Sequence, residues 1–326
     1  MKFLVHIGVN KTGTSSLQRA FFERRDKVSE QGIYYPEVGI QTCAHHPISR
    51  AIKGATLASQ GMPDDWQDQI RAGFGDHELC VLSSENFATV DNPAPLAGLC
   101  PPGQTKVVIY LRDYAQYMVS WYQQALHSRN IAMSLEDFLL GHRVNFARII
   151  ANWAAVYGRD NVIVRKYERK LLKDQDIVAD FCEFVRPGLE RAFDGMEHNS
   201  NPSLSGNLLF FKRILNPFIS HQESLTVASE FAGLTMLDKT FRGKLEVPAE
   251  TVAKIRHLSR EDAQLVRQDT GFDLMPKVAD IAGSPSPDMS RLEEDLARII
   301  EVSKRKDFTL LSYLERMKPL SMLLQG

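Results

Sequence analysis

Short apolar runs alternate with longer segments of helical period along the first part of the chain. The runs that we predict to be strands are Phe3–Ile7, Leu79–Leu82, Lys106–Leu111 and Val162–Arg165. Helical segments lie between them, such as the one that places Leu17, Ala20 and Phe21 on one face, and another between Asp174 and Val185. Buried strands that alternate with helices are typical of a parallel sheet covered on both faces. The pattern therefore predicts an α/β protein with a central parallel sheet flanked by helices.

The strand pattern fades near Asn199, and the rest of the chain is predicted to be mainly helical. The clearest segments there are Leu208–Leu215 and Ala249–Val266. The run Ala282-Gly-Ser-Pro-Ser-Pro has the composition of a linker, and an amphipathic helical stretch follows it. We therefore expect a domain of residues 1–280 and, at 281–326, a linker with a helical C-terminal tail. The tail could dock on its own domain, pair with another subunit in a homo-oligomer, or lie on a membrane surface.

Composition and charge narrow the possible partners. The 326 residues are 44% hydrophobic and 24% charged, which suits a globular chain with one large domain. The net charge of -1 offers no broad positive surface for nucleic acid, so any anion must be held by a local cluster. The four cysteines lack paired spacing, and no stretch forms a signal peptide or approaches the ~18 apolar residues of a membrane span. We therefore expect a cytoplasmic protein with reduced thiols.

A loop rich in glycine and hydroxyl groups follows the first strand and leads straight into the first helix. The residues expected to hold a phosphate or sulfate there are Lys11, Thr12, Gly13, Thr14, Ser15 and Ser16. A helix N-terminus offers unpaired N–H groups and the positive end of a dipole, and Lys11 adds a full charge. The order differs from a Walker A loop, in which lysine follows the second glycine. The alternative is an ordinary strand-to-helix turn.

A second pair of residues has the right types for another phosphate. Arg112 directly follows the predicted strand Lys106–Leu111, at the carboxyl end of the strand, where ligands of an open α/β sheet collect. Ser120 follows eight residues later. Eight residues are about two helical turns, so both side chains can face one side. A guanidinium binds phosphate oxygens in a bidentate manner. Each residue taken singly has an alternative structural role: Arg112 could form a surface ion pair with Asp113, and Ser120 could be an ordinary serine inside a helix.

The two motifs together resemble those of the PAPS-dependent sulfotransferases, particularly the bacterial and carbohydrate branch with first loops like Lys-Thr-Gly-Thr-Ser-Ser. The resemblance implies a P-loop-like sulfotransferase fold, PAPS (3′-phosphoadenosine 5′-phosphosulfate) as co-substrate, adenosine 3′,5′-bisphosphate as product, and no metal. It also implies that the first loop holds the 5′-phosphosulfate, while Arg112 and Ser120 hold the 3′-phosphate. Tyr114 departs from the family, which usually has proline there, but proline at a helix start is not required.

The mechanism that the resemblance implies is in-line transfer to a hydroxyl, with Lys11 stabilising the leaving group. Two residues compete for the role of base. Glu85 follows the strand Leu79–Leu82 and would lie beside the same crevice, as does the base of related carbohydrate sulfotransferases. His46, next to His45, is the rival, because neutral imidazole suits base chemistry near pH 7. A helix-starting glutamate and a packed histidine pair are the structural alternatives.

Weaker features and other functions complete the picture. Arg165 could pack or reach a ligand, and Asn201-Pro202-Ser203 resembles part of a loop that closes over the nucleotide. The resemblance alone suggests a sugar acceptor in a glycolipid, oligosaccharide or surface polysaccharide. Membrane association would then arise only through a glycolipid acceptor or the C-terminal tail. Two alternatives stay open: a P-loop-type kinase for a small molecule or nucleotide, and a non-catalytic nucleotide-binding protein.

Overall fold

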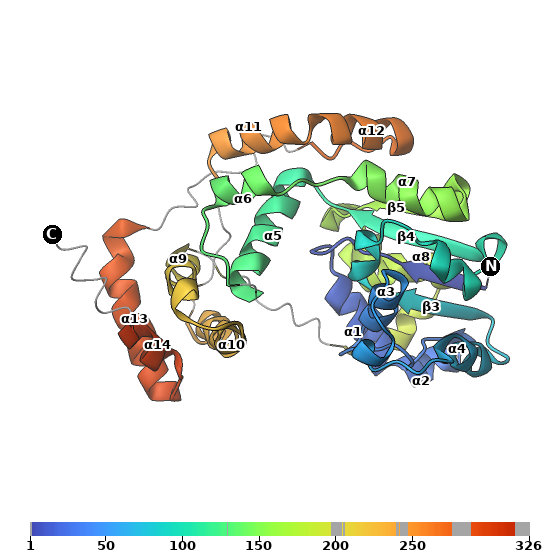
Figure 1. The fold of residues 1–326 in the computed structure, drawn as a ribbon, viewed down its shortest axis with the longest axis horizontal. Coiled ribbons are helices and arrows are strands. Elements are labelled where there is room, and N and C mark those ends of the chain that lie inside the picture. Colours follow the sequence, from blue (N-terminus) through green and yellow to red (C-terminus); the bar gives the residue numbers. More distant parts are fainter. Residues whose placement is uncertain are drawn as a thin grey trace. The chain divides into compact units, whose positions relative to one another are not determined.

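The computed structural model describes residues 2–128, 130–196, 204, 206–238, 241, 247–275 and 288–316 (Figure 1). The chain divides into two compact units. The sheet unit comprises Met1–Asp113, Asn145–Asn199 and Arg260–Leu274, and the helical unit comprises Tyr114–Val144, Ser200–Ser259 and Met275–Gly326. The predicted boundary after residue 280 falls outside the described residues, so the division into 1–280 and 281–326 stays a prediction.

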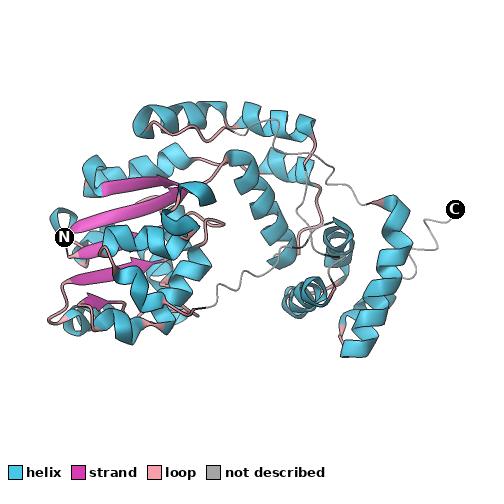
Figure 2. Ribbon diagram, turned by 180° about the vertical axis from the view of Figure 1, so that it is seen from behind, coloured by secondary structure: helices cyan, strands magenta, loops and turns pink. Residues whose placement is uncertain are grey.

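Parallel strands form the central sheet (Figure 2). The sheet has five strands, in the order β2-β3-β1-β4-β5. Their bounds are β1 Phe3–His6, β2 Ile33–Tyr34, β3 Leu79–Ser83, β4 Thr105–Leu111 and β5 Val162–Lys166. All four predicted strands are confirmed. The edge strand β2, which has two residues, is the one strand of the described chain that the sequence did not predict.

Both faces of the sheet are buried, which explains its apolar strands. Leu4, Val81 and Val108 belong to a core cluster with residues of α1, α2 and α8. Val107 and Ile109 are fully buried as well, and α7 packs against β4 and β5. The helices of this unit are α1 Thr14–Glu23, α2 Arg25–Ser29, α3 His46–Ile52, α4 Trp66–Phe74, α7 Phe146–Tyr157, α8 Ile177–Val185 and α12 Arg260–Thr270. The predicted α/β class with a parallel central sheet is confirmed.

The helical unit contains no strand among its described residues. Its helices are α5 Tyr114–Ser128, α6 Leu135–Gly141, α9 Gly206–Leu215, α10 His221–Leu237, α11 Ala249–Leu258, α13 Leu292–Lys306 and α14 Leu310–Arg316. Helices α13 and α14 confirm the predicted helical C-terminal extension. No helix in the described part of the chain is both long and apolar enough to cross a membrane.

The predicted helical segment Ala249–Val266 is helical except at one residue. The segment Ala249–Val266 is divided between α11 and α12, which belong to different units. Ser259 lies between them with φ -102° and ψ 2°, outside the helical region. The break occupies a single residue, and the apolar period continues on both sides of it. Periodicity alone therefore did not reveal it.

Candidate functional site

The sheet has its topological switch point at the carboxyl end of β1. The strands that follow β1 in sequence lie first on the side of β3 and then on the side of β4. Ligands of open α/β sheets bind at this point, outside the carboxyl ends of the strands. Three segments named in the sequence analysis follow these ends: the loop after β1, Glu85 after β3 and Arg112 after β4.

The start of the loop is fixed by the neighbouring strands. The backbone N–H of Val9 donates to the carbonyl of Tyr110 at 3.0 Å, and the N–H of Tyr110 donates to the carbonyl of Gly8 at 2.7 Å. Gly8 has a φ of 98°, and a Cβ at this position would lie 2.9 Å from both Cα and Cβ of Glu85. Only glycine therefore allows the loop to lie against Glu85 in this conformation.

The first turn of α1 presents free backbone donors. Gly13 is its N-cap, with a φ of 77°, and no side chain caps the helix. The N–H groups of Thr14 and Ser15 have no hydrogen-bond partner among the residues that the structure describes, whereas that of Ser16 donates to the carbonyl of Gly13 at 3.1 Å. The first turn also carries no acidic residue. A helix start with these properties suits an anion.

The hydroxyl groups of the loop differ in their availability. Thr12 is buried, and its hydroxyl donates to the carbonyl of Val9 at 2.6 Å. Thr14 is buried, Ser16 is half-buried and Ser15 is exposed. Because a hydroxyl has one hydrogen, Thr12 stabilises the loop itself, and any contact it makes with an anion in this conformation comes from its backbone N–H.

Lys11 and Arg112 bring two positive charges together. The Arg112 guanidinium donates from Nη1 to the carbonyl of Lys11 at 2.9 Å. Burial lowers the pKa of Lys11, and the charge of Arg112 lowers it further. In the described part of the chain, no residue forms a hydrogen bond or ion pair with the Lys11 ammonium. An ammonium that is half-buried, unpaired and close to a guanidinium is a place where an anion would be stabilised.

Tyr167, which the sequence did not identify as a site residue, contacts both Arg112 and the start of α1. The Arg112 guanidinium lies over its ring, 5.8 Å from the ring centre. Its hydroxyl oxygen would lie 3.2 Å from a Cβ placed on Gly13. The one available signal was its position directly after β5, at the same edge of the sheet.

Ser120 lies on α5, which belongs to the helical unit, whereas Arg112 belongs to the sheet unit. The expectation that both residues hold one phosphate therefore stays a prediction.

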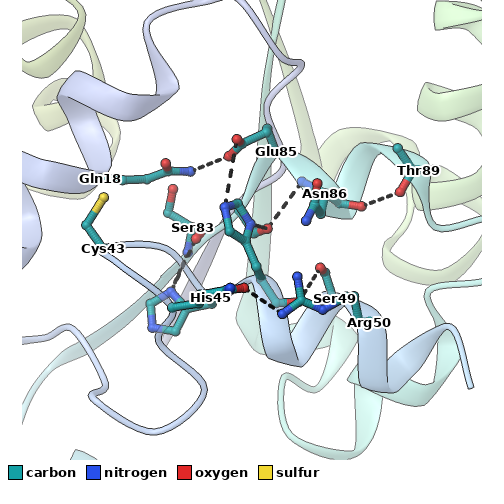
Figure 3. Close-up of polar contacts among 12 residues, drawn as sticks. Gln18, Cys43, His45, Ser49, Arg50, Ser83, Glu85, Asn86 and Thr89 are labelled. Atoms are coloured by element: carbon teal, nitrogen blue, oxygen red, sulfur yellow. Dashed lines mark hydrogen bonds and ion pairs between the residues drawn. The ribbon is translucent and has the colours of Figure 1, made fainter. Parts of the chain in front are cut away.

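Glu85 is oriented by the helix that follows the loop. It begins a short 3-10 helix, η2 (Glu85–Thr89), and Gln18 of α1 donates from Nε2 to its Oε2 at 2.8 Å (Figure 3). Gln18 is buried, so this contact is shielded from solvent. Gln18 was not among the site residues predicted from the sequence. The signal was a polar residue three positions before Phe21, beside the apolar stripe of the helix.

The two candidate bases lie together. His46 begins α3, and its Nε2 is 3.9 Å from Oε1 of Glu85. Its Nδ1 lies 2.8 Å from the hydroxyl of Ser84, which accepts a hydrogen bond from the N–H of Asn86 at 3.2 Å. If Ser84 donates its own hydrogen to Nδ1, the ring hydrogen of a neutral His46 is on Nε2, on the side of Glu85. Burial lowers the pKa of His46, Glu85 acts in the opposite direction, and Arg50 lowers it.

His45 has a structural role. Its Nδ1 accepts from the N–H of Ser83 at 3.0 Å, and its Nε2 lies 3.0 Å from the carbonyl of Pro36, to which it donates. Burial lowers the pKa of His45 to about 4, so the ring is neutral near pH 7. Figure 3 shows His45 against Ser83, with Glu85 on the far side of Ser83. His45 thus holds the start of α3 against β3.

No three His, Cys, Asp or Glu side chains of the described residues group as metal ligands, and the predicted absence of a metal stays a prediction.

The weaker candidates have other places. The Arg165 guanidinium pairs with the buried carboxylate of Asp180, which also accepts from the hydroxyl of Tyr110 at 2.8 Å. The packing alternative therefore describes Arg165. The predicted closing segment Asn201-Pro202-Ser203 lies outside the described residues.

Comparisons with known proteins give limited similarity. No family model matches the chain. An uncharacterized protein of Archaeoglobus fulgidus is 30% identical over 101 residues, which are 31% of this chain and 27% of that protein, so the match spans about a quarter of its length. A sulfotransferase from Alicyclobacillus acidocaldarius is similar in structure, with 17% identity, a TM-score of 0.40, and coverage of 70% of this chain and 95% of that one. A gluconokinase from Sinorhizobium meliloti 1021 has 16% identity, a TM-score of 0.25, and coverage of 60% and 98%. Both TM-scores are below 0.5, so neither likeness bears on the activity of this chain.

Proposed function

We propose that this chain is a PAPS-dependent sulfotransferase that transfers the sulfuryl group to a hydroxyl of a sugar-containing acceptor. One arrangement carries the proposal. The free N–H groups at the start of α1 and the unpaired Lys11 ammonium belong to a loop that lies directly against Glu85. A cradle for an anion and a carboxylate base are therefore adjacent, as sulfuryl transfer to a hydroxyl requires.

The 5′-phosphosulfate of PAPS would lie at the N-terminus of α1. The acceptor oxygen attacks the sulfur while the bond from sulfur to the bridging oxygen breaks, and that oxygen leaves with the phosphate of adenosine 3′,5′-bisphosphate. Lys11 and the N–H groups of Thr14 and Ser15 neutralise the charge that develops on the leaving group. The proton of the acceptor hydroxyl moves to Glu85.

Glu85 is the better candidate for the base, and His46 is a positioning residue. Gln18 donates to one carboxylate oxygen of Glu85, and Nε2 of His46 lies 3.9 Å from the other. His46 itself is engaged through Nδ1 by Ser84.

The proposal also covers the site of the 3′-phosphate, the acceptor and the cellular location. Arg112, which already braces the loop at Lys11, would with Ser120 contact the 3′-phosphate. The sugar acceptor rests on the resemblance of the two motifs to the sulfotransferase family. The reaction would need no metal and would take place in the cytoplasm.

The proposal is tested by incubating the purified chain with PAPS and a panel of oligosaccharides and measuring adenosine 3′,5′-bisphosphate by chromatography. A parallel reaction contains ATP and magnesium instead of PAPS. We expect acceptor-dependent release of adenosine 3′,5′-bisphosphate and no turnover of ATP. Turnover of ATP without turnover of PAPS would indicate the kinase alternative. Tight binding of both nucleotides without turnover on any acceptor would indicate a non-catalytic nucleotide-binding protein.

A further inference from the structure

An arginine with only neutral partners lies one helical turn from His46, the neighbour of the proposed base. Arg50 follows His46 by four residues on α3, one helical turn, so the two side chains lie on the same face. Its guanidinium donates from Nη2 to the amide oxygen of Gln41 at 2.7 Å and from Nε to the amide oxygen of Gln60. No carboxylate of the described residues pairs with it. Its charge acts on His46, whose pKa it lowers.

A second cation continues this surface. The Lys53 ammonium donates to the hydroxyl of Thr89 at 3.1 Å, and Thr89 is the last residue of η2, which Glu85 begins. Helix α3 packs against η2, so Lys53 spans the two elements. Like Arg50, it has no carboxylate partner among the described residues. We call the cluster of Gln41, Arg50, Lys53 and Gln60 the α3 rim.

Helix α3 and the proposed contact of the 3′-phosphate are linked to strands on opposite sides of β1. Arg112, the proposed contact of the 3′-phosphate, follows β4, on one side of β1. Glu85 follows β3, on the other side, and α3, which carries Arg50, begins directly after His45, whose N–H donates to the carbonyl of Ser83 at the end of β3. An acceptor hydroxyl that reaches Glu85 would therefore have its neighbouring groups near the α3 rim.

We infer that the α3 rim binds an anionic group of the acceptor, so that the acceptor is an acidic sugar that carries a carboxylate or sulfate near the reacting hydroxyl. The inference rests on the proposed function, because it takes Glu85 as the point that the hydroxyl reaches. A guanidinium binds either anion in a bidentate manner. Two amides already orient Arg50, so little side-chain entropy is lost on binding, and they are themselves suited to sugar hydroxyls.

Binding measured without nucleotide tests the inference separately from sulfuryl transfer. Isothermal titration calorimetry would compare tetragalacturonate, a sulfated carrageenan tetrasaccharide and neutral maltotetraose on the wild-type chain and on Arg50→Gln, Lys53→Gln and Lys106→Gln. Lys106 is exposed near the amino end of β4, whereas the candidate site lies at the carboxyl ends of the strands. Lys106→Gln therefore serves as the matched control. Thermal melts would show that each variant is folded.

We expect at least one acidic probe to bind more tightly than maltotetraose, and the preferred probe identifies the anion. Arg50→Gln should weaken the binding of the preferred probe about tenfold. Lys53→Gln should weaken that binding less, and Lys106→Gln should leave it unchanged. Equal binding of acidic and neutral probes, or an unchanged affinity in Arg50→Gln, would overturn the inference. If an acidic probe binds through Arg50 but PAPS is never turned over, the α3 rim stands as an acidic-sugar site while the proposed sulfotransferase reaction fails.

Discussion

The Arg112 guanidinium donates a hydrogen bond of 2.9 Å to the backbone carbonyl of Lys11. A residue predicted to contact a distant phosphate therefore also shapes the loop proposed to hold the first one. Its charge lies close enough to Lys11 to lower the pKa of that ammonium, in addition to the larger effect of burial. The protonation of Lys11 therefore depends on the charge of Arg112, so a change at Arg112 can be detected in the pKa of Lys11.

The coupling predicts a shift in the pH profile of Arg112→Gln. A neighbouring positive charge disfavours protonated Lys11, so its removal raises the pKa of Lys11. The alkaline limb of kcat/KM for PAPS should therefore move to higher pH, even though the maximal rate falls. Profiles between pH 7 and 11 would show it, with Lys106→Gln as a variant that loses a charge elsewhere. An alkaline limb that stays in place or moves to lower pH would contradict the coupling.

Two substitutions distinguish the base from its neighbour. Glu85→Gln keeps an oxygen that accepts from Gln18 but cannot take a proton, so kcat should fall by about 10²–10⁴ while the affinity for adenosine 3′,5′-bisphosphate is unchanged. His46→Gln should cost less, since His46 acts through Glu85. Single-turnover rates and calorimetry would measure both. If His46→Gln abolished turnover and Glu85→Gln left it intact, His46 would be the base.

Gly8→Ala tests the close contact between the loop and Glu85. An alanine with the φ of 98° is strained, and its Cβ would also clash with Glu85. Gly188→Ala is the matched control, because Gly188 has a φ of 90° and nothing lies within 4 Å of a Cβ there. The control should lose about 1–2 kcal/mol of unfolding free energy. Gly8→Ala should lose about 1–3 kcal/mol more, together with most of the turnover. Equal losses in urea unfolding would show that the clash is absent.

Two buried histidines predict a loss of stability in mild acid. Burial lowers the pKa of His6 from 6.5 to about 3 and that of His45 from 6.5 to about 4. Below pH 6.5 the unfolded chain binds protons that these native rings do not, so the free energy of unfolding falls as the pH decreases from 6.5 towards 4. The slope is up to about 1.4 kcal/mol per pH unit for each histidine.

Urea unfolding at several pH values between 7 and 5 would measure this slope. His45→Gln, which keeps a donor for the carbonyl of Pro36, should reduce the slope because one titrating group is gone. A free energy of unfolding that is flat over this range would exclude neutral burial of the two rings.

The strands and the loop could be predicted because their signals are local. Apolar runs mark β1, β3, β4 and β5, and their ends place the loop, Glu85 and Arg112 at one edge of the sheet. Strand β2 escaped because two residues are too few for a period. The α11 and α12 boundary escaped because it interrupts the helical period at Ser259 alone.

The contacts within the candidate site could not be predicted, because they depend on packing between distant segments. Residues 45 and 46 meet β3 only because the backbone and ring of His45 bond to Ser83. That contact brings His46 close to Glu85, so the two candidate bases are neighbours. The inward hydroxyl of Thr12 depends on how the loop bends back to Val9, which its composition does not reveal.

The most direct test of the central claim is the ratio of affinities for adenosine 3′,5′-bisphosphate and adenosine 5′-phosphate. The two ligands differ only in the 3′-phosphate, so the ratio isolates the second phosphate site even if Arg112→Gln also disturbs the loop at Lys11. Calorimetry should show that the wild-type chain prefers the bisphosphate by about tenfold or more, and that Arg112→Gln loses this preference. Equal affinities for the two nucleotides in the wild-type chain would contradict a site built for PAPS.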